Sequence, residues 1–424
     1  MTSPSSTDPF SRFLAVYDEA RPKRRDGKRF SSGEHLWLGG HGAKRALERF
    51  NGDFNKALDP ELFSSIPRKN TRDALRYGEL VALSGDFYDS PESFFEEKPS
   101  AIPWLWEDND LGDLRGLFAE ELRWIEERNG RQGQPYPDNN LRFAWNAKSY
   151  VELALRNVDH FGWHNLLAYR RHHAEALRLA AAARGRDDET FRRARYTNAF
   201  ADHFLTDGFA AGHVRVPRAE IRAWAEERGF NEKIAGALSK VLHDQDGHID
   251  AGSLHGVHDE NRRADDDGLP VQNSLGAKWF TRCDGQLFLE AGSEGSPAVE
   301  QAVAAVSASV TELLVAWQEG TLPRGTYEAT KHVPFPRPGS PALAEKFPAS
   351  LPPERLEALW QSVGWYAKIP WISGMERHHI AALFEALPAI MARFRANVAA
   401  DVDRDPELTE RLAAPYIAAY RSVA

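Results

Sequence analysis

The segment 201–217, ADHFLTDGFAAGHVRVP, carries side chains that could bind a metal ion within an otherwise apolar stretch. His203 and Asp207 are four residues apart, so on a helix they lie on one face with Cβ atoms about 5–6 Å apart. This separation suits two ligands of one zinc ion, whose bonds to nitrogen and oxygen are about 2.0–2.2 Å long. Gly208 and Gly212 would let the backbone leave the helix, so that His213 turns back toward the same cavity. The alternative interpretation is a buried imidazole–carboxylate pair without a metal.

Three other segments place a histidine or an aspartate among apolar residues. SGEHLWLGG contains His35, ALSGDFYDSPE contains Asp86, and RNVDHFGWHN contains His160, with His164 as a local rival one turn later. An ionisable group costs free energy on burial unless it is paired or bound to a metal. Several such residues on separate helices therefore favour a shared metal cluster over isolated structural pairs.

The order of these residues resembles that of the zinc-dependent phospholipase C family, which shares its fold with the P1/S1-type nucleases. The resemblance covers about residues 31–320. It rests on a series of short motifs: HLW at His35, Asp86–Phe87, His160–Phe161, and the His-x3-Asp-x5-His spacing of His203, Asp207 and His213. The last motif is fairly specific, and the ordered series is more so.

The resemblance implies an all-α domain that holds two or three zinc ions. By residue-for-residue match, one zinc would have four ligands: Asp86, His160, His203 and Asp207. Asp207 would bridge to a second zinc held by His35. His213 would hold a third together with a later histidine and an acid. Asp86 would also serve as the catalytic general base.

The chain departs from the family pattern at both ends of the site. Family members use the amino group and carbonyl of a mature N-terminal Trp as zinc ligands. Here more than thirty residues precede His35, so that another ligand, such as His41, would have to take this role. In addition, Asn157 stands where choline-binding members have an aromatic residue, three positions before the His-Phe motif. The head group of the substrate therefore does not follow from the resemblance.

The family closes its site with a His-x3-Glu pair, and the chain offers two candidates for it. His243 ends a predicted helix in LHDQDG, with Asp246 near it. His255 and Asp259 are the one His-x3-acid match in 241–260. His243 is favoured slightly, and both candidates stay open.

Helical spacing dominates the chain and predicts an all-α fold. Amphipathic periodicity with capping signals predicts helices over 31–50, 70–88, 111–129, 164–185, 187–212, 231–247 and 296–320. Strand-like alternation is limited to segments such as 268–280. We expect a zinc-dependent phosphoesterase domain over 1–320, followed by a Pro- and Gly-rich linker and a helical region over 321–424.

The composition of the chain argues against some classes of function. The formal net charge of −9 argues mildly against a nucleic-acid-binding protein, so we expect no stable nucleic-acid partner. The single cysteine, Cys283, excludes intrachain disulfides, on which secreted nucleases of this fold depend. Neither a signal peptide nor a long apolar run is readable, so we expect a soluble protein, cytoplasmic or exported without a leader. His172 and His173 lie in an arginine-rich stretch and are expected to contact solvent.

These features together predict a phospholipase C that cleaves the glycerol-side phosphodiester bond of phospholipids to diacylglycerol and a phosphorylated head group. Two alternatives stay open: a single-strand-specific nuclease of the same fold, and a non-catalytic helical binding protein. The segment 359–372, LWQSVGWYAKIPWI, is rich in Trp and Tyr, which favour membrane interfaces. We expect it either to pack on the catalytic domain or to contact a lipid surface. The oligomeric state stays open.

Overall fold

The computed structural model describes residues 32–54, 58–69, 73–96, 111–127, 146–246, 268–282, 296–338, 353–363 and 373–422. It also describes short pieces between these ranges, including Asn139, Asp284 and Leu287. Over these residues the structure is mostly helical, which confirms the all-α class. The residues His255 and Asp259 lie outside the described part of the chain.

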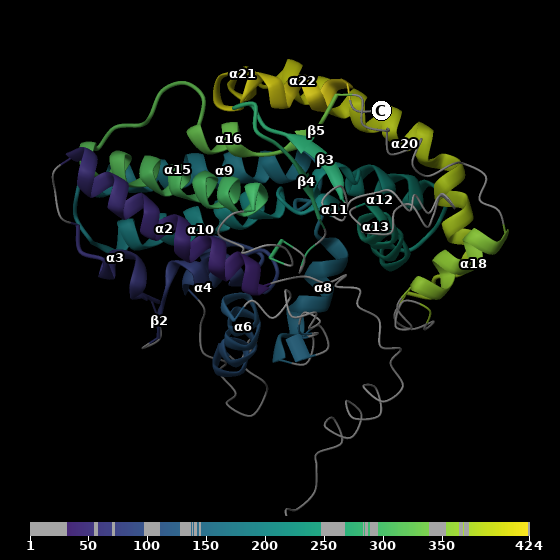
Figure 1. Ribbon diagram of the computed structural model, residues 1–424, viewed down its shortest axis with the longest axis horizontal. Helices are drawn as coiled ribbons and strands as arrows, with labels where there is room; N and C mark the ends of the chain where they lie inside the picture. The colour runs from purple at the N-terminus through teal and green to yellow at the C-terminus, as the bar shows by residue number, and fades with distance from the viewer. Residues whose placement is uncertain are drawn as a thin grey trace, which may run out of the picture.

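Five helices that run side by side form the centre of the molecule (Figure 1). They are α2 (Ser32–Phe54), α4 (Tyr77–Leu83), α9 (Trp163–Ala183), α10 (Glu189–Asp207) and α15 (Pro297–Glu319). Helix α10 begins at Asp188, whose carboxylate accepts hydrogen bonds from the backbone N–H groups of Thr190 and Phe191. From Ala194 to Asp207 every residue of α10 is buried. A polar side chain on this stretch is shielded from water, so a missing partner inside the protein costs it free energy.

Shorter elements surround this bundle. They are α3 (Glu61–Ser64), β1 (Ile66–Pro67), β2 (Ala74–Leu75), α5 (Pro91–Glu96), α6 (Leu111–Glu126), α8 (Lys148–Arg156), α11 (Ala211–Arg215), α12 (Arg218–Glu227) and α13 (Glu232–Asp246). The helix predicted over 70–88 begins only at Tyr77, because Ala74 and Leu75 pair with β1 as a short antiparallel ladder. The other predicted helices agree with observed ones to within a few residues, apart from the end of 187–212, which belongs to α11.

A small antiparallel sheet joins the two predicted regions of the chain. Its order is β4 (Lys278–Thr281), β3 (Leu269–Gln272), β5 (Phe335–Pro336). β3 and β4 lie where the sequence showed strand alternation, whereas β5 belongs to the segment predicted as a linker. The same segment contains the short helix α16 (Glu328–His332), which packs on α15.

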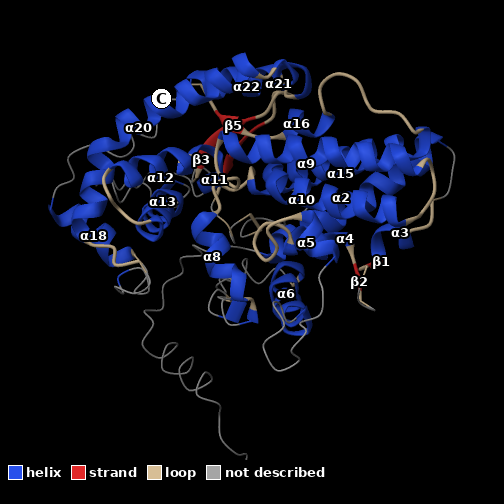
Figure 2. Ribbon diagram, turned by 180° about the vertical axis from the view of Figure 1, so that it is seen from behind, coloured by secondary structure: helices blue, strands red, loops and turns tan. Residues whose placement is uncertain are grey.

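The C-terminal region consists of α18 (Pro353–Ser362), α20 (Arg377–Arg404), α21 (Pro406–Arg411) and α22 (Ala414–Ser422). Helix α20 contacts α12 and α13, and α22 contacts β5 (Figure 2). Tyr416 and Tyr420 pack against Trp163 at the start of α9, with ring centroids 6.4 and 6.2 Å away. Residues on both sides of position 320 therefore share one hydrophobic core.

Within the aromatic segment 359–372, Leu359 is buried and Trp360 is half-buried, with the Lys368 ammonium 4.5 Å from the Trp360 ring centroid. The remaining aromatic residues of this segment lie outside the described residues. Among the helices that the structure describes, α15 alone is long and apolar enough to cross a membrane. It is mostly buried against α2, α9 and α10, as expected for a core helix.

Candidate metal centre

The structure brings seven of the predicted ligands together from six elements. His35 comes from the first turns of α2, Asp86 from the turn after α4, His160 from the loop before α9, His203 and Asp207 from the end of α10, His213 from α11, and His243 from α13. Together with Asp284, they form three groups, and within each group the ligand atoms lie within 4.8 Å of one another: His35, His203 and Asp207; Asp86, His160 and His203; and His213, His243 and Asp284.

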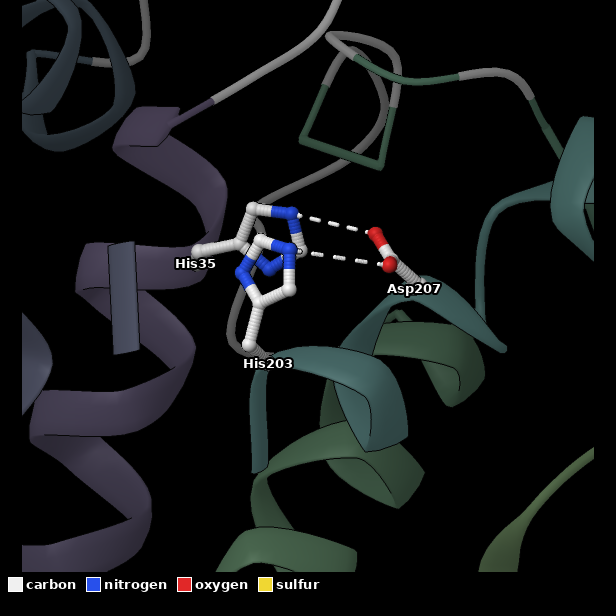
Figure 3. A group of neighbouring side chains, drawn as sticks. All are labelled: His35, His203 and Asp207. Atoms are coloured by element: carbon white, nitrogen blue, oxygen red, sulfur yellow. Dashed lines mark ion pairs between the residues drawn. The ribbon is translucent and has the colours of Figure 1, made fainter. Parts of the chain in front are cut away.

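Asp207 lies between histidines of different elements. Its Oδ1 atom is 3.3 Å from Nε2 of His35, and its Oδ2 atom is 2.8 Å from Nδ1 of His160. His203, one helical turn before it, places Nε2 3.7 Å from Oδ2 (Figure 3). The two carboxylate oxygens thus face different nitrogen ligands, which is the geometry that a bridging carboxylate requires.

The outward-facing nitrogens of His35 and His203 are donors. Nδ1 of His203 lies 3.0 Å from the carbonyl oxygen of Val81, which can only accept. Nδ1 of His35 lies 2.7 Å from the Thr206 hydroxyl, which donates its own hydrogen to a backbone carbonyl one turn earlier. Both Nδ1 atoms therefore carry the proton in the neutral rings. Their Nε2 lone pairs then face the interior of the site, as in metal-bound histidines.

The group of His213, His243 and Asp284 shows the same orientation of the ring nitrogens. Nδ1 of His213 donates to the carbonyl oxygen of His160 at 2.7 Å, and Nδ1 of His243 donates to Asp244 at 3.0 Å. The two Nε2 atoms converge on a single oxygen, Oδ2 of Asp284, at 3.3 and 3.0 Å. Two neutral nitrogens facing one carboxylate oxygen would repel it. A cation among the three atoms, or a proton on each ring, resolves this conflict.

Asp86 adds a buried carboxylate to the first site. Its exposed fraction is 3%, and within the described part of the chain its carboxylate makes no hydrogen bond or ion pair. Burial raises the pKa of Asp86 to about 6, and the charge of Asp207 raises it further, although His160 and His35 oppose this. A cation at this position would relieve the cost of burying an unpaired charge.

The other two carboxylates are held in the charged form. Burial opposes ionisation of Asp207, but positive charge on His160, His213 and His203 outweighs it and holds the pKa of Asp207 well below its usual range. His213 and His243 likewise overcome burial and lower the pKa of Asp284. Burial would lower the pKa of His213, yet Asp284 and Asp207 raise it to about 9. At neutral pH both acids are thus ionised, whereas His213 must release a proton before it can bind a cation.

Two glycines leave room for the imidazole rings. A Cβ atom at Gly85, where φ is +73°, would lie 2.7 Å from Cδ2 of His203 and 2.9 Å from Nε2 of His160. A Cβ atom at Gly212 would overlap the ring of His243. The expected role of Gly212 in leaving the helix is therefore wrong, because it lies within α11 and provides space instead. Gly208 also keeps a right-handed helical conformation, with φ −57°.

Asp284 is the candidate ligand that the sequence did not reveal. It follows β4 and is not close in sequence to any histidine, so no local spacing marks it. Asp246, the acid noted near His243, instead forms a buried pair with Arg215 at 2.7 and 2.8 Å. The turn after Asp284 is held by Glu34, whose carboxylate accepts a hydrogen bond from the Leu287 N–H at 3.1 Å.

Several histidines of the described residues lie outside the three ligand groups, and three of them had a predicted role or position. His164, the local rival of His160, faces Glu220 at 3.6 Å. His41 is exposed and stacks on Trp37 with ring centroids 3.8 Å apart, so it does not complete the site at His35. His173 was expected to contact solvent, but this is wrong. It is fully buried and contacts Asn198 and Glu312 at 2.7 and 2.9 Å.

Comparison with known proteins adds no relative from which a function could be taken. No protein-family model matches the chain, and no curated protein or solved structure shows significant similarity to it. The order of the candidate ligand residues and the geometry of the site are therefore the grounds for a proposed function.

Proposed function

We propose that this protein is a zinc-dependent phosphodiesterase of the phospholipase C type. The observation that carries the proposal is the convergence of histidine nitrogens from separate elements on two buried carboxylates, Asp207 and Asp284. His35, His203, His213 and His243 each direct Nδ1 to a protein acceptor and Nε2 toward a carboxylate. Nitrogen and carboxylate ligands in this number suit zinc.

The site offers places for more than one ion. Asp207 can share its two oxygens between the group with His35 and the group with Asp86 and His160. His213, His243 and Asp284 supply a separate three-ligand position. Zinc bound in these positions would neutralise charge on a phosphodiester and lower the pKa of a water molecule toward about 7.

Asp86 is the candidate general base. It is buried beside two histidine ligands and is not engaged in a hydrogen bond with any described residue, so its second oxygen is available to a water molecule. Asp207 contacts His35 and His160 and so fixes their relative positions. The carbonyl oxygen of Val81 accepts a hydrogen bond from His203 and fixes the orientation of its ring. These residues position the attacking water and the phosphate rather than change covalently themselves.

A phospholipid substrate is favoured over single-stranded nucleic acid by two features of the chain. The net charge of −9 disfavours a polyanionic partner, and one cysteine leaves no intrachain disulfide. The expected reaction is hydrolysis on the glycerol side of the phosphate, which yields diacylglycerol and a phosphorylated head group. Contact of the segment around Trp360 with a lipid surface stays part of the proposal.

The test combines metal analysis with product analysis. We expect the purified protein to contain two or three zinc ions and to release diacylglycerol from short-chain phosphatidylcholine or phosphatidylethanolamine, with loss of activity after chelation and recovery with zinc. Less than one zinc per chain would contradict the metal centre. Cleavage of single-stranded DNA in place of lipid would replace the phospholipase with the nuclease. Zinc without either activity would favour a binding protein.

Lipid-surface contact needs a separate test that leaves the core intact. Deleting the C-terminal region would remove β5 and α22 from the shared core, so a substitution is cleaner. We expect Trp360→Ala to lower activity on phosphatidylcholine vesicles and to leave activity on soluble short-chain lipid unchanged. Equal activity of the variant and the wild type on both substrates would contradict a lipid contact at this position.

A further inference from the structure

The C-terminal helix α22 contacts the backbone that carries a proposed zinc ligand. We propose that Tyr420 is a positioning residue, which holds α11 so that His213 meets His243 and Asp284 in ion-binding geometry. This inference rests on the proposed metal centre. It assigns a role in that centre to a region that lies outside the resemblance to the phospholipase C family.

The contact is a hydrogen bond to a specific carbonyl group. The Tyr420 hydroxyl donates to the backbone oxygen of Val214, the residue directly after His213. Tyr420 is 1% exposed, and its ring stacks on Tyr416 with centroids 4.6 Å apart. A buried hydroxyl with a single carbonyl acceptor fixes the position of that carbonyl, because losing the bond leaves a buried polar group without a partner.

The opposite side of His213 is fixed by the loop that carries His160. The Gly162 N–H donates to the carbonyl oxygen of His213 at 2.7 Å, and Nδ1 of His213 donates to the carbonyl oxygen of His160 at 2.7 Å. Gly162 has φ +56°, and a Cβ atom there would lie 3.4 Å from the ring of Phe394 in α20. Phe394 in turn contacts Tyr420, with ring centroids 6.2 Å apart. The C-terminal helices therefore cover both segments that place His213.

Movement of α11 would also change the position of a second proposed ligand, His243. The buried pair of Arg215 and Asp246 links α11 to the end of α13, three residues after His243. Helices α11 and α13 pack closely at this point, because the ring of His243 lies against Gly212. Movement of α11 would thus change the positions of both His213 and His243 relative to Asp284, which comes from a different element.

The competing explanation is that α22 contributes only core packing. Removal of the hydroxyl separates the two, because Tyr420→Phe keeps the ring that packs on Tyr416 and Trp163 and loses only the bonds of the hydroxyl, to Val214 and to the Tyr416 hydroxyl. Tyr196→Phe is a matched control. Tyr196 is also fully buried, on α10, and its hydroxyl makes no hydrogen bond with any described residue.

The measurement is zinc affinity, determined by competition with a chromophoric chelator on the full-length chain. We expect Tyr420→Phe to bind one of its zinc ions about 10-fold more weakly, in line with other changes to groups that orient metal ligands. The remaining ions should keep wild-type affinity, and Tyr196→Phe should match the wild type throughout. In a His243→Ala background, which lacks this ion, Tyr420→Phe should have no additional effect.

Unchanged affinity for every ion in Tyr420→Phe would overturn the inference, as would equal weakening of all ions. Phe394→Leu gives a second test through Gly162, and it should weaken the same ion. A wild-type protein without zinc would instead overturn the proposed metal centre itself. The two failures are therefore distinguishable.

Discussion

Helix α10 contributes to two buried polar groups that differ in how their partners are arranged. His203 and Asp207, near its end, belong to the candidate metal centre. Asn198 and Asp202 belong to a second group, called here the core polar cluster. This cluster consists of Tyr77, His173, Asn198, Asp202, Ser309 and Glu312. Both groups contain buried histidine and aspartate, so residue types alone do not separate them.

In the core polar cluster the protein supplies the partners. Both ring nitrogens of His173 face side-chain oxygens, Oδ1 of Asn198 and Oε2 of Glu312. The Tyr77 hydroxyl donates to Asp202 at 2.7 Å and accepts from the Asn198 amide at 2.8 Å. Such paired donors and acceptors stabilise a core without an ion, and among the described residues Oδ1 of Asp202 alone of these atoms has no hydrogen-bond partner.

In the candidate metal centre, Nδ1 of four histidines faces a protein acceptor and Nε2 faces the interior of the site: His35, His203, His213 and His243. Two or three histidines converge on each carboxylate of this centre, Asp207 and Asp284, whereas His173 pairs with Glu312 alone. This convergence, rather than the number of buried histidines, distinguishes a site that could hold a cation from one that does not need it.

The largest expected difference is between two aspartates of α10. We expect Asp207→Asn to lose more than about 100-fold in activity and to lose bound zinc, because changes to groups that only orient ligands already cost about 10–100-fold in affinity. Asp202→Asn, five residues earlier, should retain zinc and activity. Metal content and initial rates of the two variants check this. An active, zinc-loaded Asp207→Asn would favour the structural-pair interpretation.

Asp284→Asn should produce the next largest effect, the loss of one zinc ion. The amide cannot provide the negative charge on which Nε2 of His213 and of His243 converge. Asp259→Asn is the control, since Asp259 was the alternative closing acid. Elemental analysis after mild chelation decides between them. Loss of the ion in Asp259→Asn, with Asp284→Asn unaffected, would restore the alternative.

A substitution in the core polar cluster should lower stability and leave the metal content unchanged. We expect His173→Gln to lower the free energy of unfolding by about 1–3 kcal/mol, the usual cost of leaving a buried partner unsatisfied. Its zinc content should equal that of the wild type. Urea unfolding tests the loss of stability, and metal analysis tests the unchanged zinc content. A variant that folds normally but loses zinc would mean that the two groups are not separate.

The smallest expected effect is a pH dependence of stability that comes from the pair of His164, which is half-buried, and Glu220, which is buried. Burial would lower the pKa of His164, but Glu220 outweighs it and raises the pKa. Burial would raise the pKa of Glu220, but His164 and Asn397 lower it. The stability from His164 is thus complete below its unfolded pKa of about 6.5 and is lost as pH rises through the higher folded value. The contribution of Glu220 is lost only in acid.

The difference in unfolding free energy between wild type and His164→Gln should therefore be larger at pH 5.5 than at pH 8. Both proteins are compared after zinc removal, so that release of metal in acid does not contribute. A difference that grows with pH would contradict the pairing of His164 with Glu220.

The sequence by itself determined the helices and the ligands that share one helix. Capping residues and apolar periodicity placed α9, α10 and α15 within a few residues, and the four-residue spacing placed His203 and Asp207 on one face. The ordered motifs also selected His35, Asp86, His160, His213 and His243, which lie together in the structure. These features are readable because helix geometry depends on neighbours within a few residues.

Only the tertiary structure decided which acids lie in the candidate metal centre. Asp246 is near His243 in sequence but pairs with Arg215, whereas Asp284 reaches the same histidine from the turn after β4. Likewise His173, beside two arginines in the sequence, is buried against Glu312 of α15. A carboxylate or imidazole takes the partner that packing places within about 3 Å, and this choice depends on contacts between elements distant in the chain.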